Sequence, residues 1–367
     1  ESETATSAFN ITAQTLNNND ANAVVDVKNG LFNLNTLINQ GLIRERQENA
    51  ADSDQLLLTN IKTLNNSGEL ILYSDLALTD ASLINSGNDA YIRANALTAN
   101  NLTEFSNTGK IAAQHVLTLS RDQGLTNQGE LVANQFTANT QQDFINQGLV
   151  QANAQLEISA RNISNTSTAE ISKLGSDSDL KLTATAQLNN AGNIASKGGL
   201  KISTDDLVNS KKISSSKTTT LLTKNLDNTG LIYGNNLVVG SNSQYVAETR
   251  QGIRTEAQAS TGGLFAANTL TMYTQGVLND AYSANRLSIL SRNFLNIYGQ
   301  VKANQDVDIT ASNLVLRSTG KINVNLSSAE SEWNITRNTI NYGKITVGSN
   351  LTINTGTLKN SNDLNVA

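Results

Sequence analysis

Apolar residues in this chain alternate with polar ones at even spacings, and the same spacings recur along its length. In the stretch FINQGLVQANAQLEISARN, residues 144–162, apolar or small side chains fall at even intervals: Phe144, Val150, Ala152, Leu156, Ile158 and Ala160. A period of two is typical of a β-strand with one buried face, whereas a helix needs spacings of three and four. The pattern therefore predicts strands in both halves of the unit.

A short Asn-x-Gly signal marks the start of each unit. It occurs at Asn39/Gly41, Asn66/Gly68, Asn85/Gly87, Asn107/Gly109, Asn127/Gly129, Asn146/Gly148, Asn190/Gly192, Asn228/Gly230 and Asn341/Gly343. From residue 68 to residue 148, successive glycines of this signal are 19 to 22 residues apart. A fixed period near 20 indicates a solenoid. Because both halves of the unit look like strands, the sequence predicts an all-β, right-handed parallel β-helix with coils of about 19–20 residues and extra-helical loops. A leucine-rich repeat would need a different leucine frame and a helical return.

The recurring asparagines and glycines predict a structural ladder inside this β-helix. A buried amide can donate to and accept from the amides above and below it, so each coil would satisfy its neighbour. The glycine two residues later would supply a positive φ or a close approach at a corner. The predicted ladder consists of Asn66, Gly68, Asn85, Gly87, Asn127, Gly129, Asn146, Gly148, Asn190, Gly192, Asn228 and Gly230.

The amino-acid composition limits the classes of function that are open to the chain. The 367 residues include no Pro and no Cys, and aromatic residues make up only 4%. The lack of Pro suits a chain whose backbone N–H groups all enter hydrogen-bond ladders. A net charge of −5 without a basic stripe argues against nucleic-acid binding. No apolar run approaches a membrane span, and the first residues lack the features of a signal peptide. We expect an excised segment of a longer chain that is monomeric and binds no metal or other cofactor.

Units such as INQGLVQANAQLEISARNI and LNNAGNIASKGGLKISTDDL resemble the haemagglutinin repeats of filamentous haemagglutinin and of contact-dependent growth inhibition exoproteins. The resemblance covers most of residues 10–240 and returns at 263–323 and 339–367. It implies a long bacterial exoprotein that an outer-membrane partner barrel exports, with a β-helical shaft carrying adhesive or toxin-delivering regions at the cell surface. The Asn-Pro motifs of that family's secretion domain are missing here, because the chain has no Pro.

The repeat fails in three places, and function is expected where a scaffold repeat fails. These are the charged residues 43–55, residues 242–262 and residues 325–338, which contain the only Trp. The sequence thus predicts a regular shaft over 1–240 and a less regular β-helix over 241–367. The resemblance suggests that this second part binds a protein or glycan receptor on a target cell. Aromatic and Arg residues are favoured at protein contacts, so the candidate receptor-binding residues are Tyr245, Arg250, Arg254, Trp333 and Arg337. The alternative is that these stretches are solvated loops.

The sequence contains few candidates for catalytic residues. The sole histidine, His115, lacks the partners of a zinc site or a catalytic triad and is expected to face outward. Asp205 and Asp206 are adjacent and should point to opposite faces of a strand, whereas Asp306 and Asp308 should share one face. We therefore expect a non-catalytic protein. A β-helical polysaccharide lyase or hydrolase remains an alternative, and it would require carboxylates that face one groove on adjacent coils. A passive spacer of an adhesin is the third reading.

Overall fold

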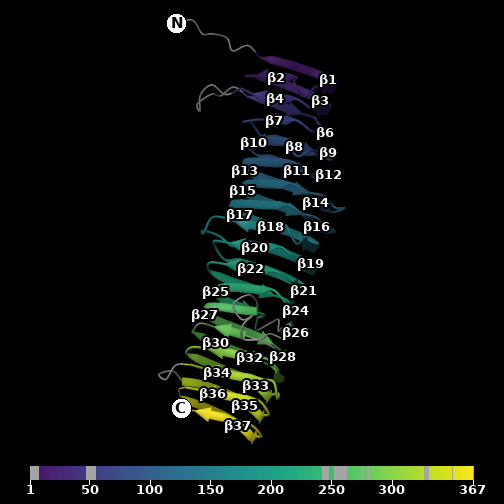
Figure 1. The fold of residues 1–367 in the computed structure, drawn as a ribbon. Helices are drawn as coiled ribbons and strands as arrows, with labels where there is room; N and C mark the ends of the chain where they lie inside the picture. The colour runs from purple at the N-terminus through teal and green to yellow at the C-terminus, as the bar shows by residue number, and fades with distance from the viewer. Residues whose placement is uncertain are drawn as a thin grey trace, which may run out of the picture. The chain divides into compact units, whose positions relative to one another are not determined.

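A computed structural model describes residues 8–46, 55–241, 248–251, 263–274, 276–278, 281–283, 285–325, 330–348 and 350–366. The chain divides into two compact units, Glu1–Gly175 and Ser176–Ala367. All regular structure in the described residues is β-strand, and the strand pairs are parallel. This arrangement, with strands of successive coils lying above one another within each unit (Figure 1), is the predicted parallel β-helix.

The strands of the first unit are β1 Phe9–Asn18, β2 Val24–Val27, β3 Gly30–Asn39, β4 Leu42–Glu45, β5 Leu56–Thr59, β6 Thr63–Asn66, β7 Glu69–Ile71, β8 Leu76–Thr79, β9 Ser82–Asn85, β10 Tyr91–Ala94, β11 Leu97–Asn100, β12 Glu104–Asn107, β13 Lys110–Ser120, β14 Leu125–Asn127, β15 Glu130–Asn139, β16 Asp143–Asn146, β17 Leu149–Asn165 and β18 Glu170–Lys173. 

The strands of the second unit are β19 Leu180–Asn190, β20 Asn193–Ser196, β21 Leu200–Asn209, β22 Lys212–Ser215, β23 Thr218–Leu222, β24 Asn225–Asn228, β25 Leu231–Val239, β26 Glu248–Gln251, β27 Gly263–Thr274, β28 Val277–Leu278, β29 Ala281–Ser283, β30 Arg286–Ser291, β31 Phe294–Ile297, β32 Gln300–Ala303, β33 Asp306–Leu316, β34 Lys321–Val324, β35 Glu330–Asn341, β36 Lys344–Val347, β37 Asn350–Asn360 and β38 Leu364–Val366.

The even spacing of apolar residues produces continuous aliphatic columns inside the coils. Phe136 pairs in register with Leu156, and Ala138 pairs with Ile158. All four side chains are buried. At one corner of the coil the pairing shifts, as between Ala133 and Gln135 on β15. That irregularity changes which parity of residue faces inward, so a long strand such as β15 keeps its apolar side on the core around the bend.

The asparagine ladder is confirmed inside both units. Along the first unit each side-chain Nδ2 donates to the Oδ1 of the next coil's asparagine, from Asn18 through Asn39, Asn66, Asn85, Asn107, Asn127 and Asn146 to Asn165, at 2.7–3.0 Å. In the second unit the same bond joins Asn190 to Asn209 and Asn209 to Asn228, at 2.8 and 2.7 Å. Buried amides are thereby satisfied from coil to coil, except that the buried Nδ2 of Asn228, at the end of this ladder, has no hydrogen-bond partner among the described residues.

Close approach explains most of the ladder glycines. A Cβ atom at Gly129 would overlap the carbonyl oxygen of Gly109 on the coil before it, and one at Gly148 would overlap the carbonyl oxygen of Gly129. Gly87 differs, because its φ of 119° is itself a conformation that favours glycine. At most of these turns there is therefore no room for a side chain where successive backbones meet.

The predicted change in regularity at residue 241 lies inside the second unit and stays a prediction. Coil pairing resumes beyond it, since Leu231 on β25 pairs with Gly263 on β27 and Leu237 pairs with Leu270. The charged stretch 43–55 begins as part of a coil, because β4 runs to Glu45. Its buried carboxylate accepts the backbone N–H groups of Tyr73 and Ser74 at 2.7 and 2.8 Å.

Candidate functional site

The structure corrects the prediction for Trp333. The stretch 330–338 is part of strand β35, which pairs with β33 and β37, so it is a regular strand of the coil. The Trp333 side chain is fully buried, and its Nε1 donates to the carbonyl oxygen of Val307 at 2.9 Å. An indole with no exposed surface cannot contact a receptor. Trp333 is therefore a core residue that joins two coils.

The remaining predicted receptor residues have mixed positions. Arg337 is exposed on β35, where the register shifts between Ile335 and Asn338. It lies on the opposite side of the strand from Trp333, so the structure does not bring these two side chains together. Arg250 lies on β26 and pairs in register with Asp227. Tyr245, Arg254 and the side chain of Arg250 lie outside the described residues. Their receptor-binding role stays a prediction.

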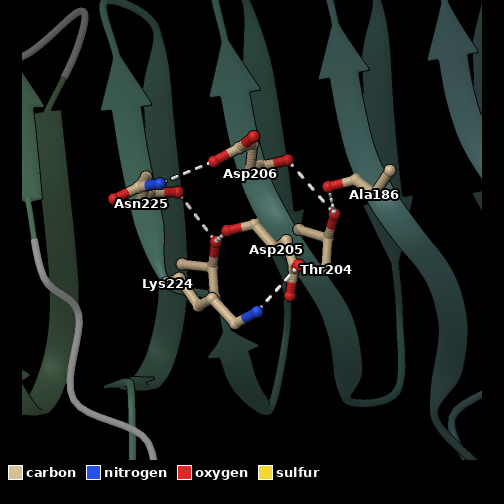
Figure 2. A network of polar contacts seen from close by, with 7 residues as sticks. Ala186, Thr204, Asp205, Asp206, Lys224 and Asn225 are labelled. Carbon is tan, nitrogen blue, oxygen red and sulfur yellow. Dashed lines mark hydrogen bonds and ion pairs between the residues drawn. The ribbon is translucent and has the colours of Figure 1, made fainter.

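A shallow polar groove of about 230 Å³ lies on the outside of β21 and β24, lined by Gln187, Asp206, Leu207, Val208, Asn225, Leu226 and Asp227. Figure 2 shows the polar contacts beside it. Asn225 donates from Nδ2 to Asp206 Oδ1 at 2.7 Å, and Lys224 Nζ pairs with Asp205 Oδ2 at 2.8 Å. Both contacts join neighbouring coils. The Lys224–Asp205 pair is half exposed, so water screens it and it contributes little stability.

Asp205 and Asp206 were predicted to face opposite ways, and this is wrong. The residues that flank this pair on β21, Thr204 and Leu207, are buried, and both aspartates between them are partly exposed. The partner strand β19 has its register shift at the same level, between Ala184 and Gln187. The bend at this corner turns two consecutive side chains outward, which a strict period of two cannot represent.

A carboxylate cluster lies on β33 and β35, where Asp306 and Asp308 share one face as predicted. Asp308 Oδ1 accepts the backbone N–H of Glu332 at 2.9 Å. Asp306 is buried, and its Oδ2 lies 3.0 Å from Arg286 Nε on β30. The other oxygen of Asp306, Oδ1, is buried and has no hydrogen-bond partner in the part of the chain that the structure describes. Two neighbouring coils therefore contribute three acidic side chains to one surface.

The electrostatics of this cluster change the proton affinity of Asp308. Burial raises the pKa of Asp308 above its usual value, and the nearby charges of Asp306 and Glu332 raise that pKa further. The N–H of Glu332 and the charge of Arg286 oppose the rise. A carboxyl whose pKa is raised by burial and by neighbouring carboxylates is a feature of acid–base sites. In the part of the chain that the structure describes, no group of acidic or histidine residues is arranged to hold a metal ion.

A third feature is a column of tyrosine and cationic side chains at one corner of the second unit. We call Tyr298, Arg317, Tyr342 and Lys359 the tyrosine–cation column. The guanidinium Cζ of Arg317 lies 5.5 Å from the ring centre of Tyr298, and Lys359 Nζ lies 5.9 Å from the ring centre of Tyr342. Both rings remain exposed, at 40% and 38% of their surface. Aromatic and cationic side chains that stay accessible are suited to binding.

Sequence reasoning missed this column, although a signal was present. Tyr342 is the middle residue of the Asn341-x-Gly343 signal, and Tyr298 stands in the same place before Gly299. The middle residue of the signal follows the inward asparagine and points outward, as the exposed Gln128 and Gln147 also do. His115 is exposed on β13, as predicted, at a register shift.

Comparisons with known proteins add no family to these observations. No family model matches the chain, and neither a curated protein nor a solved structure matches it. Among the described residues, none belongs to a helix long and apolar enough to span a membrane. The functional interpretation therefore depends on the fold and on the surface features described above.

Proposed function

We propose that this chain is a non-catalytic segment of a large secreted bacterial surface exoprotein, which extends from the cell and binds a receptor on a neighbouring cell. In this role it would serve adhesion or contact-dependent toxin delivery. The β-solenoid fold is compatible with an adhesin-like protein, and the repeat motifs resemble those of filamentous haemagglutinin. Export through an outer-membrane partner barrel is part of the same proposal and is supported only by that resemblance.

The tyrosine–cation column is the observation that carries the binding role. A passive spacer needs only a satisfied interior and a polar exterior, which the asparagine ladder and the outward polar residues supply. Exposed tyrosine rings held against cations have no such structural task. Tyr298 and Tyr342 each keep more than a third of their surface accessible, and aromatic groups dominate binding energy at interfaces.

Binding of the fluorescently labelled 367-residue chain to whole bacterial and host cells, measured by flow cytometry, tests this function. We expect saturable binding to at least one cell type, and a strong decrease with the double variant Tyr298→Ala/Tyr342→Ala. The control Lys201→Gln/Lys212→Gln changes two exposed lysines elsewhere in the second unit and should bind normally. If the wild-type chain binds no cell type, the segment is a spacer and the proposal fails.

The carboxylate cluster supports a second candidate function, a carbohydrate-active enzyme. Asp308 with a raised pKa beside Asp306 and Glu332 places a candidate acid near candidate bases on adjacent coils. Incubation with linear polysaccharides, followed by assays for new reducing ends and unsaturated products, tests it. Catalysis that is lost in Asp308→Asn would establish the enzyme, whereas the absence of product from every polysaccharide would favour the binding role.

A further inference from the structure

The tyrosine–cation column is periodic along the stacked coils. Ile297 pairs with Leu316, and Leu316 pairs with Asn341, so the residues that follow them occupy equivalent turn positions on three successive coils. Those residues are Tyr298, Arg317 and Tyr342. Backbone bonds fix the turns, because the N–H of Arg317 donates to the carbonyl of Ile297 and that of Tyr342 donates to the carbonyl of Leu316. At a spacing of about 4.8 Å per coil, the two tyrosines are about 10 Å apart.

The guanidinium of Arg317 is held in place before any ligand arrives. Arg317 directs Nε and Nη2 to the Oδ1 of Asn296, at 3.2 and 2.8 Å, while its guanidinium lies over Tyr298. Lys359 follows on the coil after Tyr342, since it pairs with Ile340 in the register of β35 and β37. Ordering the Arg317 side chain on binding therefore costs little conformational entropy.

Two further lysines extend the positive surface beside the column. Lys321 on β34 pairs in register with Lys344 on β36, and both are exposed. Like charges directly opposite each other on neighbouring strands are destabilising. Among the described residues neither lysine forms an ion pair, although Asp363 stands opposite Lys344 on the next coil, just before the Ile345–Leu364 pair. A local positive surface on a chain of net charge −5 indicates a specific anionic ligand.

We propose that the tyrosine–cation column, together with Lys344, binds a linear polyuronate, a polysaccharide with one carboxylate on each sugar, that lies along the stacking direction of the coils. This inference rests on the proposed binding function and names its ligand class. Arg317, Lys344 and Lys359 supply one cation on each of three successive coils, at the turn, just after it and just before it respectively. An extended 1,4-linked sugar advances about as far as one coil, so successive carboxylates meet successive cations. The tyrosine rings contact the apolar faces of alternate sugars.

The same geometry distinguishes this ligand from other polyanions. If the spacing of the coils matches the length of one sugar, affinity should depend on the number of sugars and on their carboxylates. Nonspecific electrostatic attraction would depend on charge density alone. Guanidinium and ammonium groups form charge-assisted hydrogen bonds with carboxylates. The methyl ester of a polyuronate keeps the sugar chain and removes the charge, so it separates the two contributions.

Fluorescence anisotropy of labelled oligogalacturonates of one to eight sugars with the whole chain tests the proposal. We expect affinity to rise until about four sugars, the coils that the column covers, and then to level off. Full methyl esterification, and separately Tyr298→Ala/Tyr342→Ala or Lys344→Gln/Lys359→Gln, should each weaken binding about tenfold or more, because each change removes several aromatic or charge-assisted contacts with the ligand. The variant Lys201→Gln/Lys212→Gln makes the same charge change elsewhere and should bind within about twofold of wild type.

Three outcomes would overturn the polyuronate assignment: no binding of oligogalacturonate, equal affinity for one sugar and for four, or tighter binding of dextran sulfate at equal charge. Circular dichroism of each variant excludes unfolding as a cause of lost binding. If cells bind the chain while oligogalacturonate does not, this inference fails and the proposed function survives. If no cell type binds the chain, the proposed function itself fails.

Discussion

Replacement of Asn127 by Leu tests how much one ladder asparagine contributes to the stability of the fold. The Asn127 side chain is fully buried, and it accepts a hydrogen bond from Asn107 Nδ2 at 2.8 Å. Its own Nδ2 donates to Asn146 Oδ1 at 2.9 Å and to the carbonyls of Gly129 and Leu149 at 2.9 and 3.2 Å. Leucine has a similar size but forms none of these four contacts.

The expected loss of stability follows from the hydrogen bonds that each partner of Asn127 keeps in the variant. Asn107 Nδ2 keeps the carbonyl of Glu130 at 3.1 Å, and the Gly129 carbonyl keeps the N–H of Leu149 at 2.9 Å. Asn146 Oδ1 loses the donor that Asn127 supplied. A buried polar atom without a partner costs about 1–3 kcal/mol, and the weakened contacts add to this, so we expect a loss of about 3 kcal/mol. In a unit of this size that lowers the melting temperature by roughly 6–12 °C.

Thermal unfolding followed by circular dichroism at neutral pH measures the effect. The control is Asn139→Leu, on the exposed side of β15 in the adjacent part of the coil. It should change stability by less than about 0.5 kcal/mol, as surface substitutions usually do. Asn127→Asp adds a further check, because its carboxylate cannot donate to Asn146 and should regain stability in acid, where a protonated carboxyl can. If Asn127→Leu and the control have the same melting temperature, the ladder hydrogen bonds do not stabilise the coil.

Three more predictions concern the interior and the carboxylate cluster. Leu156→Asp puts a charge into a buried aliphatic column and should prevent cooperative folding, seen as loss of the β-sheet circular dichroism signal; a normal spectrum would contradict the register. Gly129→Ala should destabilise by about 1–3 kcal/mol in denaturant unfolding, because its Cβ meets the Gly109 carbonyl. Asp308→Asn should raise the melting temperature at neutral pH. The folded-state pKa of Asp308 is raised, so the ionised form opposes folding above its usual pKa of 3.8, and the gain should vanish below that pH; a pH-independent gain would count against this reasoning.

The interior could be predicted from the sequence because every coil needs the same kinds of residue at the same inward positions. Even spacing identified the buried column of Leu156 and Ile158, and the recurrence of Asn-x-Gly identified the buried amides and the crowded glycines. Single positions where the backbone bends were not predictable from a period of two. Asp205 and Asp206 both face outward for that reason.

For Trp333 the error was the reverse, because the period of two was correct and was not followed. It was assigned to the surface because the recognisable signal is lost around it and because tryptophan is common at interfaces. Yet Ser331, Trp333 and Ile335 keep the even spacing of inward residues, and all three are buried. The alternation of the strand was the more reliable guide, since it reports the backbone geometry directly, whereas residue type reports only a frequency of use.

The middle residue of Asn-x-Gly explains how one fold can carry both a scaffold and a binding surface. The asparagine and the glycine are fixed by the hydrogen bonds and close contacts between coils, but the residue between them points outward and is free to vary. In the first unit that position holds Gln128 and Gln147, whose amides join at 3.1 Å and continue the polar exterior. In the second unit the equivalent position holds Tyr298, Arg317 and Tyr342. The outward residue can therefore change from coil to coil without disturbing the interior, and under the proposed binding function this one position of the repeat would determine what the surface binds.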